Sequence, residues 1–441
     1  MNSDTDLSPF IQAVSEAEPI RVHGKVTEVI GLLIESTGPM ASVGDVCTIE
    51  RNGTVVGRAE VVGFRKERTL LMPLGPIEGI HAGLTVVSTK KPLVVGVGRR
   101  LLGRVIDGLG NPLDGKGGLV PESYRPIFSR IPNPLKRRRI TEPLETGIKA
   151  IDALLTVGKG QRIGIFSASG VGKSVLLGMM AKNCSSDVNV IALIGERGRE
   201  VREFLERDLG EEGLARSVVV VATSDQPALI RLKGAMVAAS IAEYFRDQGD
   251  DVLWLCDSVT RLATAQREIG LAIGEPPATK GYTPSVFAMM PNVLERAGTS
   301  EHGTITGMFT VLVEGDDMDE PVADTARSIL DGHIVLSRQL AHRNHYPAID
   351  VLRSISRCMP DVIEAQHQGL VNRVKSLMAA YRENEDLITI GAYVQGSNAM
   401  VDKAIKVNQQ LNDFLRQRRD ERLSMQEAVK KLAEIDKIVN G

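Results

Sequence analysis

The sequence predicts an α/β protein with a parallel sheet at its centre, a small β domain before it and a helical domain after it. Between about residues 146 and 357, apolar runs of strand length alternate with helical stretches, as in a parallel sheet covered on both faces. Short alternating β segments precede this region, and mostly helical sequence follows it from about residue 358. At 441 residues, the chain is too long for one core and predicts two or three domains.

Composition restricts the class of protein. The apolar share of 43% and the charged share of 24% are those of a soluble globular protein, and no run approaches ~18 consecutive apolar residues. The polar, acidic N-terminus lacks the features of a signal peptide, which predicts a cytoplasmic protein. A formal charge of −2 provides no general attraction for nucleic acid. The four cysteines have no metal-ligand spacing and are expected to be free, buried thiols: Cys47, Cys184, Cys256 and Cys358.

Residues 1–20 predict a short helix. Ser8 can cap it, Pro9 suits its first turn, and Phe10, Ile11 and Val14 form an apolar stripe. A helix this short is not stable alone in water, so it has to dock on another surface. The residues themselves leave open whether that surface is the chain's own domain or a partner protein.

Residues 21–92 predict a small β-barrel or sandwich, with glycines between the strands. The expected strands are Val22–Ile34, Val46–Glu50, Val55–Phe64 and Thr69–Pro73.

Residues 93–145 predict a linker and the entry to the core. Asp107–Gly115 is rich in turn-forming residues, which indicates tight turns. The basic run Lys136–Arg139 lies among prolines, which favours a solvated linker over a binding patch.

Residues 146–357 form the expected sheet domain and residues 358–441 the expected helical domain. In the latter, Ser424 and Glu427 have the spacing of a capping box at the start of a helix. The core strands are expected at Arg162–Phe166, Val188–Ile194, Ser217–Ala222, Val252–Cys256, Ile305–Val313 and His333–Ser337.

A phosphate-binding loop follows the first of these strands. The segment Ser167–Ser174 reads Ser-Ala-Ser-Gly-Val-Gly-Lys-Ser and opens a helix, which is the context that a P-loop requires. Its glycines let successive backbone N–H groups point at phosphate oxygens, and the helix N-terminus adds partial positive charge. Ser167 lies at a position where the general P-loop pattern has glycine. The alternative interpretation of the whole segment is a glycine-rich turn without a function. The predicted nucleotide-binding residues of this loop are Ser169, Gly170, Val171, Gly172, Lys173, Ser174 and Val175.

Two other strand ends supply the chemistry of ATP hydrolysis. Asp257 ends an apolar strand, where it can hold Mg²⁺ together with Ser174, although such an aspartate can also simply cap the next helix. Glu196 follows another strand, at the edge where the carboxyl ends of parallel strands meet. We expect Glu196 to orient the attacking water, with Arg197 nearby to offset the developing charge. Lys173 is expected to reach the β- and γ-phosphates.

Two later residues are candidates for the same site. Tyr346 precedes Pro347 and is a plausible stacking platform for adenine. Arg357 is a candidate arginine finger that reaches the site of a neighbouring subunit, although a surface salt bridge is the commoner role of a single arginine.

Four motifs together resemble the catalytic subunits of rotary ATP synthases and their type III secretion relatives: Gly195–Glu200, Asp257–Arg261, Ala265–Glu268 and Asp331–Arg338. The resemblance implies a RecA-like P-loop ATPase core with an N-terminal β-barrel and a C-terminal helical domain, assembled as a homohexamer that uses ATP and Mg²⁺. It also implies that Glu196 is the catalytic glutamate, that Tyr346 stacks on adenine and that Arg357 acts in trans.

Further details of the resemblance favour protein export. Ser174 in place of threonine is similar to the secretion branch, and no acidic lever motif of the rotary synthases is found in the C-terminal domain. Gly391–Asn398 resembles the flagellar export ATPases more than the injectisome ATPases. The family then implies a stator-like regulatory protein at the N-terminal helix, a central stalk protein in the ring pore, export chaperones with their substrates, and peripheral association with the export gate at the inner membrane.

Three alternatives stay open on the sequence: an injectisome ATPase, a Rho-like nucleic-acid translocase, and a non-catalytic scaffold subunit. The near-neutral charge and the aromatic share of 4% speak against nucleic acid as a partner. The intact Glu196 and Asp257 speak against a non-catalytic subunit.

Overall fold

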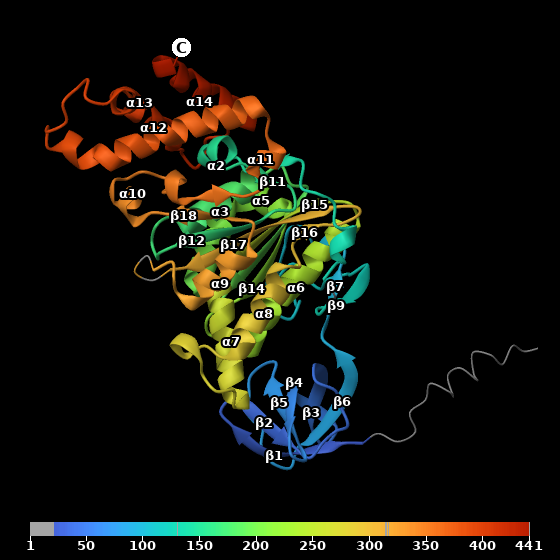
Figure 1. Ribbon diagram of the computed structural model, residues 1–441. Coiled ribbons are helices and arrows are strands. Elements are labelled where there is room, and N and C mark those ends of the chain that lie inside the picture. Colours follow the sequence, from blue (N-terminus) through green and yellow to red (C-terminus); the bar gives the residue numbers. More distant parts are fainter. Residues whose placement is uncertain (1–21, 130, 314, 316, 441) are drawn as a thin grey trace, which may run out of the picture. The chain divides into compact units, whose positions relative to one another are not determined.

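The computed structural model describes residues 22–129, 131–313, 315 and 317–440 (Figure 1). The chain divides into two compact units, Met1–Leu93 and Val94–Gly441. The predicted N-terminal helix with Phe10, Ile11 and Val14 lies outside the described residues. Within the described ranges, no helix is both long enough and apolar enough to cross a membrane.

The first unit is a closed six-stranded antiparallel barrel with the order β1-β2-β5-β4-β3-β6. The predicted continuous strand Val22–Ile34 is wrong, because the chain turns at Gly31 (φ 56°) and makes two strands. The last strand was not predicted, since five of its eight residues are polar or charged. The strands are β1 (Gly24–Ile30), β2 (Leu33–Ser36), β3 (Asp45–Arg51), β4 (Thr54–Arg65), β5 (Arg68–Pro73) and β6 (Thr85–Pro92).

The second unit is built on a nine-stranded sheet with the order β19-β18-β12-β17-β15-β13-β14-β8, and β16 pairs with β17 beside this path. All pairings are parallel except those of β16 and β19. The six predicted core strands are confirmed to within one residue at each end. The strands are β8 (Arg104–Asp107), β12 (Arg162–Ser167), β13 (Val188–Ile194), β14 (Ser217–Ala222), β15 (Asp251–Asp257), β16 (Gly298–Thr299), β17 (Thr304–Leu312), β18 (Gly332–Leu336) and β19 (Ile355–Ser356).

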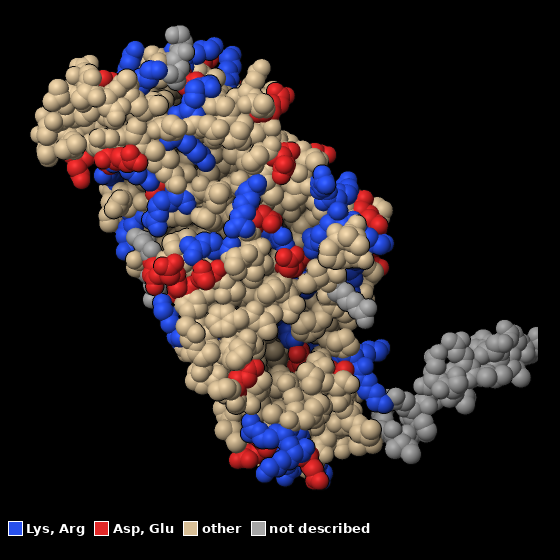
Figure 2. All heavy atoms as spheres, in the orientation of Figure 1, with Lys and Arg blue, Asp and Glu red and all other residues tan. Residues whose placement is uncertain are grey.

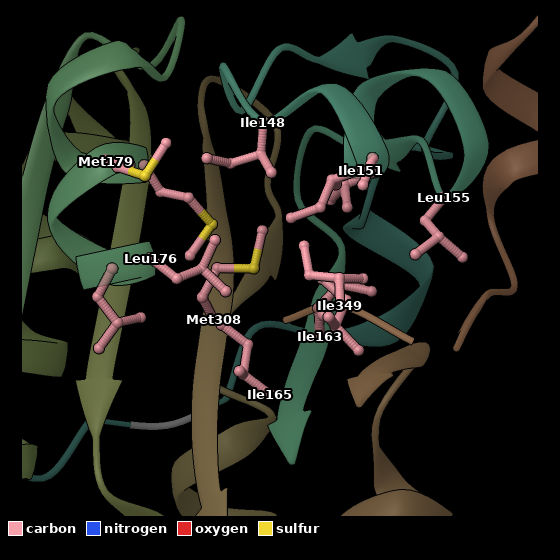
Figure 3. Packing of buried hydrophobic residues seen from close by; sticks show 14 of the residues in the cluster. Ile148, Ile151, Leu155, Ile163, Ile165, Leu176, Met179, Met308 and Ile349 are labelled. Atoms are coloured by element: carbon pink, nitrogen blue, oxygen red, sulfur yellow. The ribbon is translucent and has the colours of Figure 1, made fainter. Parts of the chain in front are cut away.

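Both faces of this sheet are buried, as the continuous apolar strands predict. On one face, Ile163, Leu253 and Met308 belong to a single cluster with residues of α2, α3 and the C-terminal helices. Figure 3 shows Ile163 and Met308 in this cluster, near Ile151 and Leu176. On the other face, the rings of Trp254 and Phe309 meet edge to face at 5.1 Å, and α6 contacts β13, β14 and β15. The helices of this region are α2 (Lys149–Leu154), α3 (Lys173–Asn183), α4 (Gly198–Glu203), α5 (Gly210–Ala215), α6 (Ala228–Asp247), α7 (Val259–Ile273), α8 (Pro284–Leu294), α9 (Pro321–Ile329) and α10 (Arg338–His342).

Part of the predicted linker belongs to the sheet. β8 pairs with β14 at its edge, and β7 (Val94–Val97) pairs with β9 (Ser123–Pro126). The sequence did not predict β8, because the strand has only four residues and directly precedes the glycine-rich turns. The basic run is also not simply solvated: Arg137 and Arg138 donate to carbonyl oxygens between residues 295 and 302.

The C-terminal region is helical, as predicted. The capping box is confirmed, because Glu427 N donates to Ser424 Oγ and the Glu427 carboxylate accepts from Ser424 N at 2.9 Å. The apolar faces of these helices join the cluster that covers the sheet through α2. The four cysteines are free, and all but the half-buried Cys358 are fully buried. The remaining elements are β10 (Pro143–Leu144), β11 (Val157–Gly158), α11 (Met359–Val362), α12 (Ala365–Thr389), α13 (Ala399–Leu415) and α14 (Met425–Asn440).

A buried ion pair connects α6 to the end of α8. The Arg296 guanidinium makes two hydrogen bonds of 2.8 Å with the Glu243 carboxylate, and both side chains are at most 4% exposed. We predict that Arg296→Met destabilises this unit by about 3–5 kcal/mol, because it leaves the Glu243 carboxylate buried without a positive charge to pair with, and only Ser129 Oγ still donates to it. Trp254 is the only tryptophan of the chain and is buried in this unit, so urea unfolding followed by its fluorescence measures the change.

The matched control is Arg99→Met, which removes the half-exposed partner of Asp250 and should cost no more than about 1 kcal/mol. Equal shifts of the unfolding midpoint in the two variants would contradict the prediction.

Candidate active site

The loop between β12 and α3 has the geometry of a phosphate cradle. Gly170 and Gly172 have φ angles of 80° and 91°, in the region that favours glycine, and α3 begins directly after them at Lys173. A Cβ atom at Gly172 would lie 3.3 Å from two ring atoms of Tyr346. The Tyr346 ring therefore lies directly against the loop at Gly172.

Ser167, which departs from the usual pattern, is the last residue of β12. Its hydroxyl is buried and has no hydrogen-bond partner in the described part of the chain. The pocket lining begins one residue later, at Ala168. Serine in place of glycine at position 167 therefore affects the interior of the sheet and leaves the lining of the cradle unchanged.

Three charged side chains from three strand ends meet at the carboxyl edge of the sheet. Lys173 Nζ donates to Asp257 Oδ1, and it lies 3.4 Å from Glu196 Oε1. Thr310 on β17 donates its hydroxyl hydrogen bond to the same Asp257 oxygen at 2.7 Å. Sequence reasoning did not find Thr310, because a threonine within a strand carries no distinguishing signal.

The ionisation of this group is set by burial and mutual charge. Burial, aided by the charges of Asp257 and Glu200, raises the pKa of Glu196 to about 7, although Lys173 opposes the shift. Burial works against the charge of Lys173, but the Asp257 and Glu196 carboxylates raise its pKa. Near neutral pH, Glu196 is consequently poised between its neutral and charged forms, as general bases commonly are.

A cavity of about 630 Å³ opens over the loop, a size typical of small-molecule sites. Its wall includes the carboxylates of Glu196 and Glu200, and it carries more positive than negative side chains, which suits an anionic ligand. The predicted Arg197 is in the wall, but three arginines were not predicted. Arg261 and Arg338 follow the ends of β15 and β18 closely, at the edge of the sheet where ligands bind. This position in the sequence could have predicted them. The cations of the wall are Lys173, Arg197, Arg207, Arg261 and Arg338.

Tyr346 lies beside the phosphate-binding loop, whereas Arg357 lies at the opposite edge of the sheet. Tyr346 is 40% exposed beside Gly172, and its carbonyl oxygen accepts from Gln417 N at 2.9 Å. Arg357 is exposed and donates its backbone N–H to Asp331 O, at the amino end of β18. The six-residue β12 spans about 16 Å, so the amino edge of the sheet lies farther from its own loop than an arginine reaches. The structure therefore does not bring Arg357 to the pocket of its own chain.

Ser174 and Asp257 line one narrow pocket together with Glu196 and Glu200. In the ranges described, no cluster of three or more His, Cys, Asp or Glu side chains is arranged to hold a metal. One carboxylate and one hydroxyl fit Mg²⁺, which retains waters and shares its coordination with substrate phosphates.

Comparison with known proteins agrees with this geometry. Residues 147–356 match the ATP synthase alpha/beta family, nucleotide-binding domain, and residues 26–90 match the beta-barrel domain of the same family. Residues 363–434 match the T3SS EscN ATPase C-terminal domain. A "Flagellum-specific ATP synthase" of Bacillus subtilis is 55% identical over 97% of this chain and 98% of that protein. The chain belongs to the ATP synthase alpha/beta family. It is a P-loop ATPase with the RecA-like core, β-barrel and helical domain that the sequence predicted.

Other members of the family come from both branches of type III export. The "Flagellum-specific ATP synthase" of Salmonella typhimurium is 49% identical over 97% of this chain and 96% of that protein. The "Type 3 secretion system ATPase" of Xanthomonas euvesicatoria is 51% identical over 91% of both chains. The assembled ATPase EscN of the enteropathogenic E. coli type III secretion system superimposes with a TM-score of 0.89, at 44% identity over 93% of this chain and 99% of EscN.

The raised pKa of Glu196 predicts a pH-dependent cost to stability. A carboxyl whose pKa rises from 4.5 to about 7 on folding stabilises the protein fully only below pH 4.5, and that contribution is lost as the pH rises to 7. We predict that Glu196→Gln makes the ligand-free protein more stable than the wild type at pH 8, by up to about 3 kcal/mol, with a smaller difference at pH 5. Urea unfolding at the two pH values measures this difference.

Glu203→Gln is the control, because Glu203 lies exposed on α4 outside the pocket. A Glu196→Gln effect that is the same at both pH values would contradict the prediction.

Proposed function

We propose that this chain hydrolyses ATP in a homohexameric ring that energises type III export of flagellar proteins. The observation that carries the proposal is the Lys173–Asp257–Glu196 group beside an intact phosphate cradle, in a chain that keeps Arg357 away from its own pocket. In a ring enzyme with shared sites, each subunit holds every part of its own site except the arginine, which the neighbouring subunit supplies. The flagellar branch is supported by the B. subtilis and Salmonella relatives, and the ring by the assembled EscN.

Substrate binding begins with an exchange of ion pairs. Without nucleotide, Lys173 pairs with both Asp257 and Glu196. When ATP enters, the backbone N–H groups of Ser169–Val175 hold the phosphates, and Lys173 turns to the β- and γ-phosphates. This movement frees Asp257, which with Ser174 would hold Mg²⁺. When bound, Mg²⁺ neutralises charge on the β- and γ-phosphates.

The same exchange prepares Glu196 for catalysis. In the ionised state, its carboxylate accepts a hydrogen bond from the attacking water and orients it toward the γ-phosphate. Arg197 lines the pocket beside it and offsets negative charge that develops on the phosphoryl oxygens. Tyr346 stacks on adenine at the other end of the cradle. Arg357 of the adjacent subunit completes the site when the ring closes.

Ring closure is coupled to the C-terminal helices, which we propose to be the place where chaperone–substrate complexes are released and unfolded. The hydrogen bond between Gln417 N and Tyr346 O connects the segment after α13 to the nucleotide site. A central stalk in the pore is supported by the structure of EscN in complex with its central stalk EscO, with a TM-score of 0.87. We further propose that the N-terminal helix binds a stator-like regulatory protein, and that the cytoplasmic ring associates peripherally with the export gate at the inner membrane.

The second candidate function is that of an injectisome ATPase, which the Xanthomonas relative and the EscN-type C-terminal domain favour. The site chemistry would be the same in both. A Rho-like translocase has less support, because charges of both signs are interspersed on the face shown in Figure 2. Restoration of flagellar export by this chain in cells that lack their own export ATPase tests the flagellar assignment.

We predict that the specific ATPase activity rises with protein concentration and that Glu196→Gln abolishes it at every concentration. The rise follows from a site shared between subunits, and the loss follows from removal of the group that orients water. A flat profile would place the complete site within one subunit. Activity that survives the substitution would remove Glu196 from the mechanism.

Mixing two inactive variants tests Arg357 directly. Arg357→Ala subunits keep an intact pocket, and Glu196→Gln subunits keep Arg357, so a mixed ring contains complete sites. We predict that each variant alone is inactive and that an equimolar mixture recovers part of the wild-type activity. Arg353→Ala, an exposed arginine four residues earlier, is the control and should retain activity alone. A mixture that stays inactive would contradict the role in trans.

Stacking of adenine on Tyr346 predicts a change in binding more than in turnover. We expect Tyr346→Ala to weaken ATP binding by about tenfold or more, since stacking of a base on an aromatic ring contributes about 1–3 kcal/mol. Titration with a fluorescent ATP analogue measures the affinity. Tyr346→Phe is the matched control and should bind like the wild type, and equal affinities of the Ala and Phe variants would contradict the stacking role.

A further inference from the structure

A turn at residues 133–139 presents an apolar side chain to solvent. Leu135 lies in the short helical turn Pro134–Lys136, and 95% of its surface is exposed. The side chain of Asn133 fixes the turn by accepting a hydrogen bond from Leu135 N at 3.0 Å. Single exposed leucines are ordinary, but Leu135 differs from them in how its turn is held and in where it lies.

The turn is fixed by a socket that fits one arginine. Arg137 donates to Ala297 O at 2.9 Å and to Glu295 O, and Arg138 donates to Ser300 O at 2.9 Å. A Cβ atom at Gly298 would lie only 1.7 Å from Arg137 Nη1. The guanidinium thus occupies space that only glycine leaves open, and it holds the turn in place with hydrogen bonds to backbone.

A chain of polar contacts connects this socket to Arg357. Glu295 also pairs with Arg162, and Arg162 makes two hydrogen bonds of 2.9 and 3.0 Å with the Asp331 carboxylate. Asp331 O accepts the hydrogen bond from Arg357 N at 3.0 Å. The turn and Arg357 therefore share one supporting network at the amino edge of the sheet. Ile355 in β19, two residues before Arg357, is a second exposed apolar side chain, with 47% of its surface accessible.

We propose that the 133–139 turn is a subunit contact whose occupant is a second copy of this chain, the neighbour into whose nucleotide pocket Arg357 reaches. The inference rests on the proposed ring function. An arginine that completes another subunit's site needs its backbone held at a fixed distance from that site, and a contact on the same supporting network provides this. The neighbour buries Leu135 and Ile355, while Lys136 and Arg139 form the polar rim. The assembled state of the similar EscN supports a second copy as the occupant.

The test compares Leu135→Ser with the wild type by sedimentation velocity in Mg²⁺ and a non-hydrolysable ATP analogue, and by ATPase activity against protein concentration. We expect the concentration for half-maximal activity to rise about tenfold or more, since a buried leucine is lost from the contact. The activity at saturating protein should approach that of the wild type, because Leu135 is not in the pocket. Leu135→Met retains the apolar area and should assemble normally. Gly298→Ala, which displaces Arg137, should weaken assembly as Leu135→Ser does.

Thermal unfolding controls for folding, since substitution at so exposed a position should leave the unfolding midpoint unchanged. Normal assembly of Leu135→Ser would overturn the proposal and would leave this turn for a different partner. Wild-type protein that stays monomeric under all conditions, with activity independent of concentration, would overturn the ring itself. The failure of the contact and the failure of the proposed function are therefore distinguishable.

Discussion

The second unit depends on one electrostatic arrangement, a buried ammonium group held between two buried carboxylates. Lys173 lies between Asp257 and Glu196, and each of the three side chains is at most 14% exposed. Burying a charge is costly unless it is paired, so Lys173 offsets the cost of burying Asp257 and part of the cost of burying Glu196. The three come from different strand–loop junctions. Only a parallel sheet brings the carboxyl ends of such strands to one edge, so the fold and the site are required together.

The arrangement is not the most stable one available to this sequence. Two carboxylates share one ammonium group, and burial keeps the pKa of Glu196 near neutrality. The excess negative charge makes the group ready to exchange its partner for a phosphate chain. The cationic wall of the pocket attracts the triphosphate, and the glycines of the loop leave its backbone N–H groups accessible. In the proposed mechanism, nucleotide binding and the preparation of Glu196 for catalysis follow from the same imbalance of charge.

The two edges of the sheet have different tasks. The carboxyl edge holds the nucleotide pocket, while the amino edge carries Arg357, the Arg162–Asp331 pair and the turn at Leu135. In the proposed ring, the carboxyl edge of one subunit receives Arg357 from the amino edge of the next, as identical subunits in head-to-tail contact around a closed ring require. The buried Arg296–Glu243 pair supports α8 from inside, next to the segment that holds the turn. Rigid support behind an exposed contact limits the entropy lost on assembly.

The sequence by itself determined the parallel sheet, the phosphate cradle and most of the residues gathered at it. Strand-length apolar runs, the glycine spacing of Ser167–Ser174 and the acids after strands are local signals, because each reports the backbone or burial of its own segment. Tertiary structure alone decided what depends on distant segments. It placed β8 in the sheet, Thr310 against Asp257, Arg207 in the pocket wall and Arg137 in a socket made by residues 160 positions away. Such contacts carry no periodicity or motif, since they are set by how the packed elements meet and not by the sequence around either partner.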